Sequence, residues 1–259
     1  MAITPRMIVT PPEPRGLRPG LFVATNGPIP LDPHGAAGGI TYDPVSCGQA
    51  HYYDSVCGSG GGQKTFDSND TIIKANPFTV YASLACGSAG TTPAQLETKV
   101  LRRLANGEQT IAEYGMGMVL AAGATPLTPA DATLTGVVSD LEQWLYGIGG
   151  VNYGNIGYLH AAPRLAAYAA DENLIVRDGP LLKTPMGTIW IFGGGYPDTG
   201  TIFISGQVTV WRSPGIFVTP AEQALNLTTN EYHMLAERDY AVAYDCVAAS
   251  AVFDWMPLS

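Results

Sequence analysis

The clearest helical pattern in the chain begins at Thr92-Pro93-Ala94-Gln95. Thr92 offers an N-cap hydroxyl, Pro93 suits the first helical position, and Gln95 occupies the capping-box position. Apolar residues then recur at helical spacing, at Leu96, Val100, Leu101, Leu104, Ile111 and Met118. The pattern predicts a long helix over residues 92–120 that is interrupted at Gly107 and frays around Gly115 and Gly117.

Two shorter helices are predicted further along the chain. One is opened by Thr128, runs from Pro129 and ends near Gly147, with an apolar face formed by Leu134, Val137, Val138, Leu141, Trp144 and Leu145. The other is the alanine-rich segment 163–170, which follows a strand-like segment at residues 156–160.

Strand patterns lie on both sides of these helices. Residues 78–86 alternate between apolar and polar side chains, which predicts a strand. From Gly187 onward strands dominate, with apolar segments at residues 188–192, 201–210 and 232–246. The glycines at 193–195 lack the spacing of a dinucleotide-binding fingerprint, so we interpret them as a turn between strands.

The first seventy residues favour extended structure instead. Seven prolines in residues 1–30 exclude a long helix and indicate an extended arm, because proline lacks a backbone donor and fixes its own torsion. Glycine is dense from residue 35 to residue 70, with a cluster at Gly58, Gly60, Gly61 and Gly62. This composition is typical of a long hairpin with a mobile tip.

Composition describes a folded chain that is a poor nucleic-acid binder. The 259 residues are 46% hydrophobic and only 14% charged, which argues against disorder and allows one large domain or two closely joined ones. With 13 basic and 22 acidic residues the net charge is −9, which opposes binding to phosphate backbones as a main role. No apolar run has the length of a membrane span and no signal-peptide pattern opens the chain, so we expect the protein to be made and kept in a cytosol.

The cysteines leave alternatives open. Four scattered cysteines, Cys47, Cys57, Cys86 and Cys246, are too few for a disulfide framework, and we expect reduced, partly buried thiols. Cys47, His51, Cys57 and Cys86 have the chemistry of a zinc site, but their spacing matches no compact ribbon or finger. A disulfide between Cys47 and Cys57 across the hairpin is the other alternative.

No catalytic signature is present. Residues 58–65 resemble a phosphate-binding loop, but Gln63 stands where glycine is required before Lys64, and no helix follows. His160 and His233 are candidate bases, and Ser88, Ser205 and Cys246 are candidate nucleophiles, yet none lies in a nucleophile-elbow context. The carboxylate pairs Asp171–Glu172 and Glu237–Asp239 are expected to be exposed, with Glu237-Arg238 forming an ion pair to a neighbouring subunit or to the long helix. We therefore predict no catalytic, cofactor-binding or metal-binding residue.

The order of elements resembles that of tailed-phage major capsid proteins, whose fold encapsulin shells share. In that family an arm and an extended loop precede a long spine helix, a central mixed domain and a long strand that returns along the spine helix. The resemblance covers nearly the whole chain and implies an α+β fold. Its parts are an N-terminal arm at 1–34, an extended hairpin loop and return strand at 35–91, the spine helix at 92–125, an axial domain at 126–219, and the returning strand with the C-terminal segment at 220–259.

The function that this resemblance implies is self-assembly into an icosahedral shell around double-stranded DNA. The expected partners are other copies of the chain in hexamers and pentamers, together with scaffold, decoration and portal proteins. The shell would enclose DNA without sequence-specific contacts, use no membrane, and assemble in the host cytoplasm as part of the virion. Some family members cross-link loop lysines to asparagines of neighbouring subunits; Lys64 and Lys74 are the candidates here, but nothing in the sequence identifies their partner.

Three alternatives belong to other classes. A minor virion protein, such as a tail-tube, decoration or connector protein, would share the acidic and glycine-rich character. An encapsulin-type compartment would have the same fold and carry enzyme cargo. A β-rich ligand-binding module would explain the aromatic residues Trp190, Trp211, Tyr196 and Phe203, although aromatic residues in strands are more often core.

Overall fold

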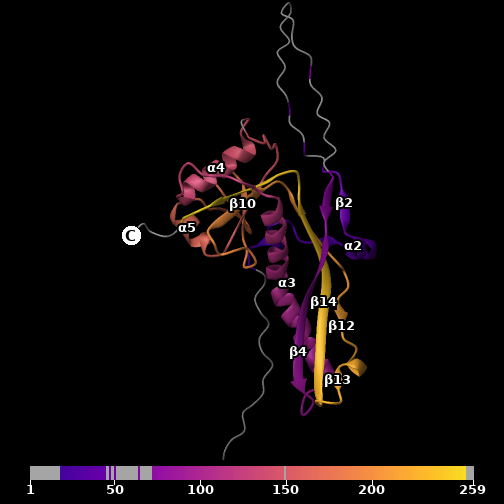
Figure 1. The fold of residues 1–259 in the computed structure, drawn as a ribbon. Helices are drawn as coiled ribbons and strands as arrows, with labels where there is room; N and C mark the ends of the chain where they lie inside the picture. The colour runs from indigo at the N-terminus through magenta and orange to yellow at the C-terminus, as the bar shows by residue number, and fades with distance from the viewer. Residues whose placement is uncertain are drawn as a thin grey trace, which may run out of the picture.

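The computed structural model describes residues 18–44, 47, 50, 64, 72–148 and 150–254. A long helix and two long strands extend away from a body that holds two of the shorter helices and a second sheet (Figure 1). The first seventeen residues of the predicted arm and the predicted hairpin tip, including Cys57 and His51, lie outside the described residues.

Helix α3 (Pro93–Gly123) is the long helix that the capping pattern predicts. The Gln95 backbone N–H donates to the Thr92 hydroxyl at 3.3 Å, and the Thr92 N–H donates to the Gln95 side chain at 3.1 Å. The expected interruption at Gly107 is wrong, because the helix continues through all of its glycines. Packing against the sheet outweighs the roughly 1 kcal/mol that a glycine costs within a helix.

The buried face of α3 differs from the expected one. Ile111 and Met118 were placed on the apolar face, but they are 43% and 57% exposed. The buried face consists of Leu96, Val100, Leu104, Glu108, Gln109, Ala112, Glu113, Met116, Gly117 and Leu120. It therefore includes two carboxylates, which occupy core positions of the helical repeat.

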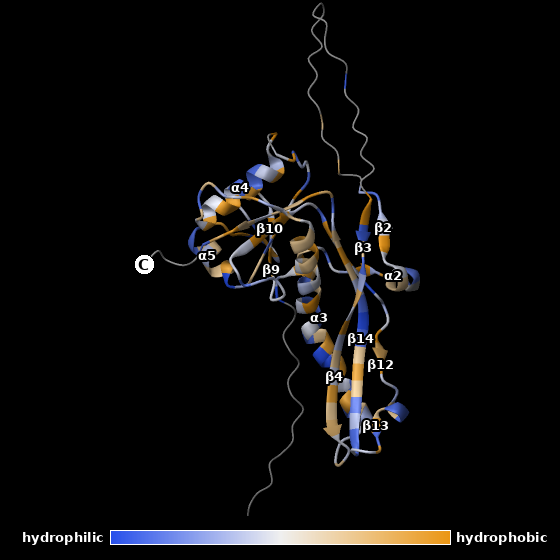
Figure 2. Cartoon of the chain, in the orientation of Figure 1, coloured by the Kyte–Doolittle hydropathy of each residue, from blue (hydrophilic) through white to orange (hydrophobic). Residues whose placement is uncertain are grey.

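A six-stranded sheet lies along α3. Its centre is β14 (Glu231–Tyr244), the predicted returning strand, which pairs antiparallel with β4 (Pro77–Gly87) over eleven positions, from Glu231 opposite Gly87 to Ala241 opposite Pro77. On its other side β14 pairs with β11 (Val208–Arg212), β12 (Phe217–Val218) and β13 (Leu225–Asn226). β1 (Ile29–Pro30) adds to β11 in parallel, and a 3₁₀ turn, η1 (Ala221–Gln223), precedes β13. Hydrophobic and hydrophilic residues both occur along β14 (Figure 2).

A seven-stranded sheet forms the body, in the order β5-β15-β10-β6-β9-β8-β7. The strands are β5 (Thr125–Pro126), β6 (Tyr158–Ala161), β7 (Val176–Asp178), β8 (Leu181–Lys183), β9 (Ile189–Phe192), β10 (Thr201–Ser205) and β15 (Ala248–Val252). The sheet accompanies helices α4 (Leu134–Tyr146) and α5 (Leu165–Asp171). Helix α4 begins later than the predicted Pro129, because its N-cap is Thr133, whose hydroxyl accepts from the Gly136 N–H at 3.1 Å.

The central strands of this body sheet, β6, β9 and β10, are buried on both faces, which explains their continuous apolar character. Ile189 and Ile191 of β9 belong to the core that α3 shares with the six-stranded sheet. Trp190 and Phe192, which alternate with them, belong to the core beneath α4 and α5. One strand thus connects the two hydrophobic cores.

The N-terminal part completes the fold with short elements. Helix α1 (Leu21–Ala24) places Leu21 and Phe22 in the core shared with α3. Helix α2 (Pro33–Gly38) is capped by Asp32 and leads into β2 (Ile40–Tyr42), which pairs with β3 (Ile73–Ala75). These two strands confirm the base of the predicted hairpin.

The turn after β9 touches the backbone of α3. A Cβ atom on Gly195 would lie 2.2 Å from both the Thr110 carbonyl oxygen and the Tyr114 backbone nitrogen. Only glycine permits this approach, since neither helix backbone atom can move aside. At the glycine-rich turn, the backbone of the body sheet therefore packs directly against the backbone of the long helix.

Two glycine substitutions should change stability in opposite directions. Gly107→Ala adds a methyl group where no atom lies within 4 Å, so we expect unfolding to become about 0.5–1 kcal/mol less favourable. Gly195→Ala should destabilise by about 1–3 kcal/mol, because the new methyl group overlaps the helix backbone. Denaturant unfolding of both variants measures the difference. Equal stability of the two variants would contradict the proposed contact at Gly195.

Candidate functional site

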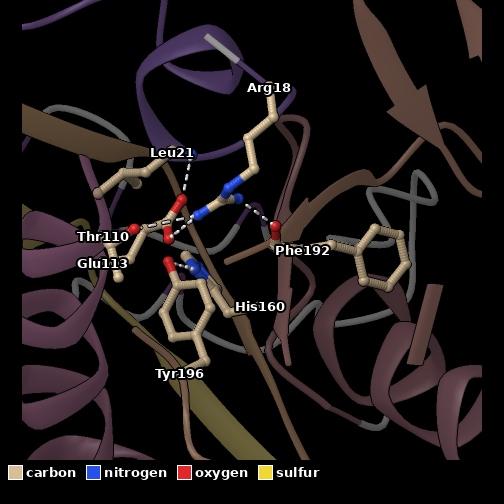
Figure 3. Close-up of polar contacts among 7 residues, drawn as sticks. All are labelled: Arg18, Leu21, Thr110, Glu113, His160, Phe192 and Tyr196. Carbon is tan, nitrogen blue, oxygen red and sulfur yellow. Dashed lines mark hydrogen bonds and ion pairs between the residues drawn. The ribbon is translucent and has the colours of Figure 1, made fainter. Parts of the chain in front are cut away.

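A polar cluster joins three parts of the chain at the contact between α3 and the body sheet (Figure 3). The Arg18 guanidinium donates to Glu113 Oε2 at 2.7 Å and to the Phe192 carbonyl oxygen at 2.8 Å. Glu113 Oε1 accepts from the Leu21 backbone N–H at 3.4 Å. Arg18 and Leu21 come from the N-terminal part, Glu113 from α3 and Phe192 from β9, so this cluster connects the chain start, the helix and the sheet.

The two side chains of this ion pair differ in their burial. The Glu113 side chain is fully buried, whereas the Arg18 side chain is 42% exposed. A buried carboxylate needs a counter-charge and hydrogen bonds to be tolerated. Gly20 allows the N-terminal segment to supply both, because a Cβ atom there would lie 2.6 Å from Glu113 Oε1.

A second, uncharged chain of hydrogen bonds lies beside it. His160 Nδ1 is 2.8 Å from the Tyr196 hydroxyl, and His160 Nε2 is 3.0 Å from the Ser205 hydroxyl. The Ser205 hydroxyl donates to the Gly206 carbonyl oxygen at 3.1 Å. With the imidazole proton on Nε2, each hydroxyl donates once and all three side chains are satisfied.

Burial sets the protonation states of this chain. Desolvation lowers the pKa of His160 to about 3, because the imidazolium would be fully buried. Burial, followed by the negative charge of Glu113, raises the pKa of Tyr196 well above its ordinary value. Both groups are therefore neutral at physiological pH and act as hydrogen-bonding links between β6, β10 and the turn after β9.

Glu108 forms a third polar cluster, one and a half turns before Glu113. Its carboxylate lies 3.1 Å from an Arg212 nitrogen, 3.2 Å from an Arg238 nitrogen and 2.8 Å from the Tyr240 hydroxyl. The Glu108 and Arg238 side chains are only 11% and 12% exposed. Burial, together with the Glu108 charge, raises the pKa of Tyr240. Glu108 thus fixes α3 to β11 and β14 of the six-stranded sheet.

The structure brings two candidate catalytic residues together but gives them no access. His160 and Ser205 are hydrogen-bonded, yet both are completely buried. A general base at neutral pH needs a pKa near 7, which His160 does not have. A nucleophile also needs a path for its substrate, so this pair serves packing rather than hydrolysis.

The other candidate residues are separate from one another. His233 lies 3.6 Å from Glu231 on the exposed part of β14, and Ser88 hydrogen-bonds to Asn230. Asp171 and Glu172 are exposed, as expected, and Glu172 accepts hydrogen bonds from Thr135. Glu237 and Asp239 are half-buried instead of exposed, and Asp239 accepts from Thr79 at 2.7 Å. The ion pair expected of Glu237-Arg238 is made by Arg238 to Glu108 of the long helix.

The cysteines differ from the sequence-based expectation. Cys47 forms a disulfide with Cys246, 199 residues away, so the prediction that these thiols are reduced is wrong for this pair. Cys86 is a free thiol near the Thr91 hydroxyl. In the described part of the chain, no three His, Cys, Asp or Glu side chains gather as a metal site would require. None of the described helices combines the length and the apolar character needed to cross a bilayer.

The buried carboxylates are the functional residues that the sequence reasoning missed. A signal was present for Glu108, which continues the four-residue spacing of Leu96, Val100 and Leu104. A carboxylate on a core stripe indicates a buried partner. The identity of that partner is a tertiary feature, because Arg18, Arg212 and Arg238 come from distant segments.

Among the comparisons with known proteins, only the one with solved structures found similar proteins. No protein-family model matches the sequence, and no curated protein matches it. A structure of Microbacterium phage Oxtober96 aligns with a TM-score of 0.55 at 9% identity, covering 97% of this chain and 96% of the other. The mature capsid of bacteriophage PhiM1 aligns at 0.54 and 8% identity (98% and 93% covered), and the capsid of a native GTA particle at 0.53 and 11% identity (95% of each). The chain therefore has the α+β fold of these solved structures, two of which are capsids.

Removing the Arg18 charge should be costly. We expect Arg18→Met to lower the free energy of unfolding by about 2–3 kcal/mol, because Glu113 stays buried without its cation. Arg164→Met is the matched control, since Arg164 and Asp198 form an ion pair with side chains that are 58% and 51% exposed. Loss of that exposed pair should cost at most about 1 kcal/mol. Similar losses in both variants, measured by denaturant unfolding, would show that Glu113 does not depend on Arg18.

His160 should make the fold sensitive to acid. The unfolded state binds a proton below about pH 6.5, whereas buried His160 remains neutral until about pH 3, so stability falls as the pH is lowered through that window. Between pH 7 and pH 5 the wild type should lose about 2 kcal/mol more than His160→Gln. His233→Gln, a change at an exposed histidine, is the matched control for replacing a histidine by glutamine. Parallel pH profiles for wild type and His160→Gln would exclude this role.

Proposed function

We propose that this chain is a major capsid subunit that assembles into the icosahedral head shell around the double-stranded DNA of a tailed phage. The observation that carries the proposal is the match to capsid structures over almost the whole length of both chains, from 93% to 98%. Agreement of this extent includes the long helix, the paired long strands and the body sheet together.

The arrangement of the described residues supports self-association. The long pair β4 and β14 extends beyond the body together with α3, which leaves much of this layer's surface for neighbouring molecules (Figure 1). Large apolar side chains are exposed at several turns, notably Ile148 after α4 at 92% and Leu227 after β13 at 86%. Single exposed apolar residues are common, but contacts repeated around each subunit add up in a closed shell.

The proposed parts follow the boundaries expected from the sequence. Within the proposed arm at 1–34, residues from Arg18 onward pack on the subunit's own helix and core. The earlier part of the arm, together with the hairpin loop of the 35–91 segment that also holds the return strand, would contact neighbouring subunits. The axial domain at 126–219 would surround the hexamer and pentamer axes. The net charge of −9 suits a wall that encloses DNA without trapping it. Scaffold, decoration and portal proteins would be the further partners, and assembly would take place in the host cytoplasm.

Electron microscopy of the purified protein, beside size-exclusion chromatography, tests the proposal. Closed shells, or rings of five or six subunits, are the expected result, with scaffold co-expression as the second arm. Nuclease-protected DNA inside the shells would support a phage head, whereas enzyme cargo would favour an encapsulin-type compartment. A monomer under every condition, including with scaffold, would overturn shell assembly and favour a minor virion protein or a ligand-binding module.

Surface substitutions should separate assembly from folding. Ile148→Asp and Leu227→Asp change side chains that contribute little to the folded monomer, so unfolding should shift by less than about 0.5 kcal/mol. If these residues are buried between subunits, the concentration needed for assembly should rise about tenfold or more, because burial of such a side chain contributes roughly 1.5–3 kcal/mol. Ile148→Leu and Leu227→Met are the apolar controls. If light scattering shows that both aspartate variants assemble like the wild type, these two turns do not belong to the interface between subunits.

A further inference from the structure

A disulfide bond attaches the base of the hairpin to the end of the returning strand. Cys47 follows β2 by five residues, and Cys246 lies in the turn between β14 and β15. Their sulfur atoms form a disulfide with Cα atoms 5.1 Å apart. The bond therefore ties the chain that leaves β2 to the far end of the returning strand.

Other contacts place the two cysteines near each other without the bond. The Tyr42 hydroxyl donates to Asp245 Oδ1 at 2.6 Å, and the Tyr42 ring lies 5.6 Å from that of Trp211. Ile40, Tyr42 and Ile73 pack on a small cluster of Ala75, Ala241 and Ala243. The fold thus brings residues 42 and 245 together, and the cysteines are close neighbours of these two residues.

The backbone at Cys246 is unusual for its residue type. Five described residues other than glycine have a positive φ, and four of them are asparagines. The fifth is Cys246, at φ 63°. Asparagine tolerates this left-handed region, whereas a cysteine has no such preference, so the backbone does not explain the residue. The disulfide with Cys47 gives a reason for a cysteine at this position.

We propose that Cys47–Cys246 is a conditional clasp, open in a reducing cell and closed by a low-molecular-weight disulfide after folding. Both cysteines are half-buried, so a small reagent can reach them. One thiolate attacks the reagent R–S–S–R, forms a mixed disulfide and expels RS⁻. The second thiolate attacks the protein sulfur of that mixed disulfide and expels the other RS⁻. Two protein thiols are oxidised, and one reagent disulfide is reduced to two thiols.

The timing of this step rests on the proposed function. A particle that is assembled in a reducing cytosol and then released meets oxidant only after its subunits are in place. The clasp would then fix the hairpin base to the returning strand in the finished particle. Because the cysteines are close before oxidation, closing the bond requires no rearrangement of the described residues.

Thiol mapping tests the pairing and its timing. Protein from a reducing host is alkylated at lysis, or first treated with oxidised glutathione, and its peptides are identified by mass spectrometry. We expect free Cys47 and Cys246 at lysis, and an intrachain Cys47–Cys246 bond after oxidation. Cys57→Ser and Cys86→Ser should retain the bond, whereas Cys47→Ser should lose it.

Several outcomes would overturn the clasp. These are a bond already complete at lysis, pairing of Cys47 with Cys57, pairing between subunits, or two free thiols after oxidation. Mapping is carried out on unassembled protein as well as on particles. Failure to assemble would therefore count against the proposed function, while wrong pairing would count against the clasp.

The backbone argument has its own test. In reductant, Cys246→Asn should melt at the same temperature as the wild type or higher, because asparagine accepts the left-handed conformation. Oxidation should raise the melting temperature of the wild type but leave that of Cys246→Asn unchanged. Equal melting temperatures for oxidised and reduced wild type would show that the bond holds nothing in place.

Discussion

Two carboxylates buried on one helix determine how the parts of this protein are held together. Glu108 and Glu113 lie on the core face of α3, where an unpaired charge would be strongly unfavourable. Each is matched by arginines from outside the helix: Arg212 and Arg238 from the six-stranded sheet, and Arg18 from the N-terminal segment. These ion pairs connect fixed positions of the helix to fixed positions of the sheet and of the N-terminal segment.

The body sheet depends on the same helix. Its β9 strand lends alternate side chains to two hydrophobic cores, and the glycine turn that follows approaches the helix backbone directly. His160, Tyr196 and Ser205 fill the polar part of this contact with neutral hydrogen bonds. The long helix, both sheets and the N-terminal segment from Arg18 therefore form one connected unit.

The hairpin base is attached differently. Only a few residues of β2 and β3 are paired, and their small cluster contains three buried alanines. The Tyr42–Asp245 hydrogen bond and the Cys47–Cys246 disulfide add to this limited packing. A segment with little core of its own relies on such specific contacts or on a neighbouring molecule. The hairpin base is thus held by fewer contacts than the two sheets that pack on α3.

The sequence by itself determined the local elements and their order. The caps and periodicity of α3, the strands β4 and β14, and the glycine turn after β9 follow from interactions among near neighbours, which a sequence pattern records. The resemblance to capsid proteins rested on that order, and the solved structures confirm the fold. Only the tertiary structure decided the continuity of α3 through Gly107, the burial partners of Glu108 and Glu113, and the pairing of Cys47 with Cys246. These features depend on residues about a hundred or more positions apart, or on packing energies that outweigh local preference. The helical spacing marks Glu108 as a core position, but it does not identify the arginines that pair with it.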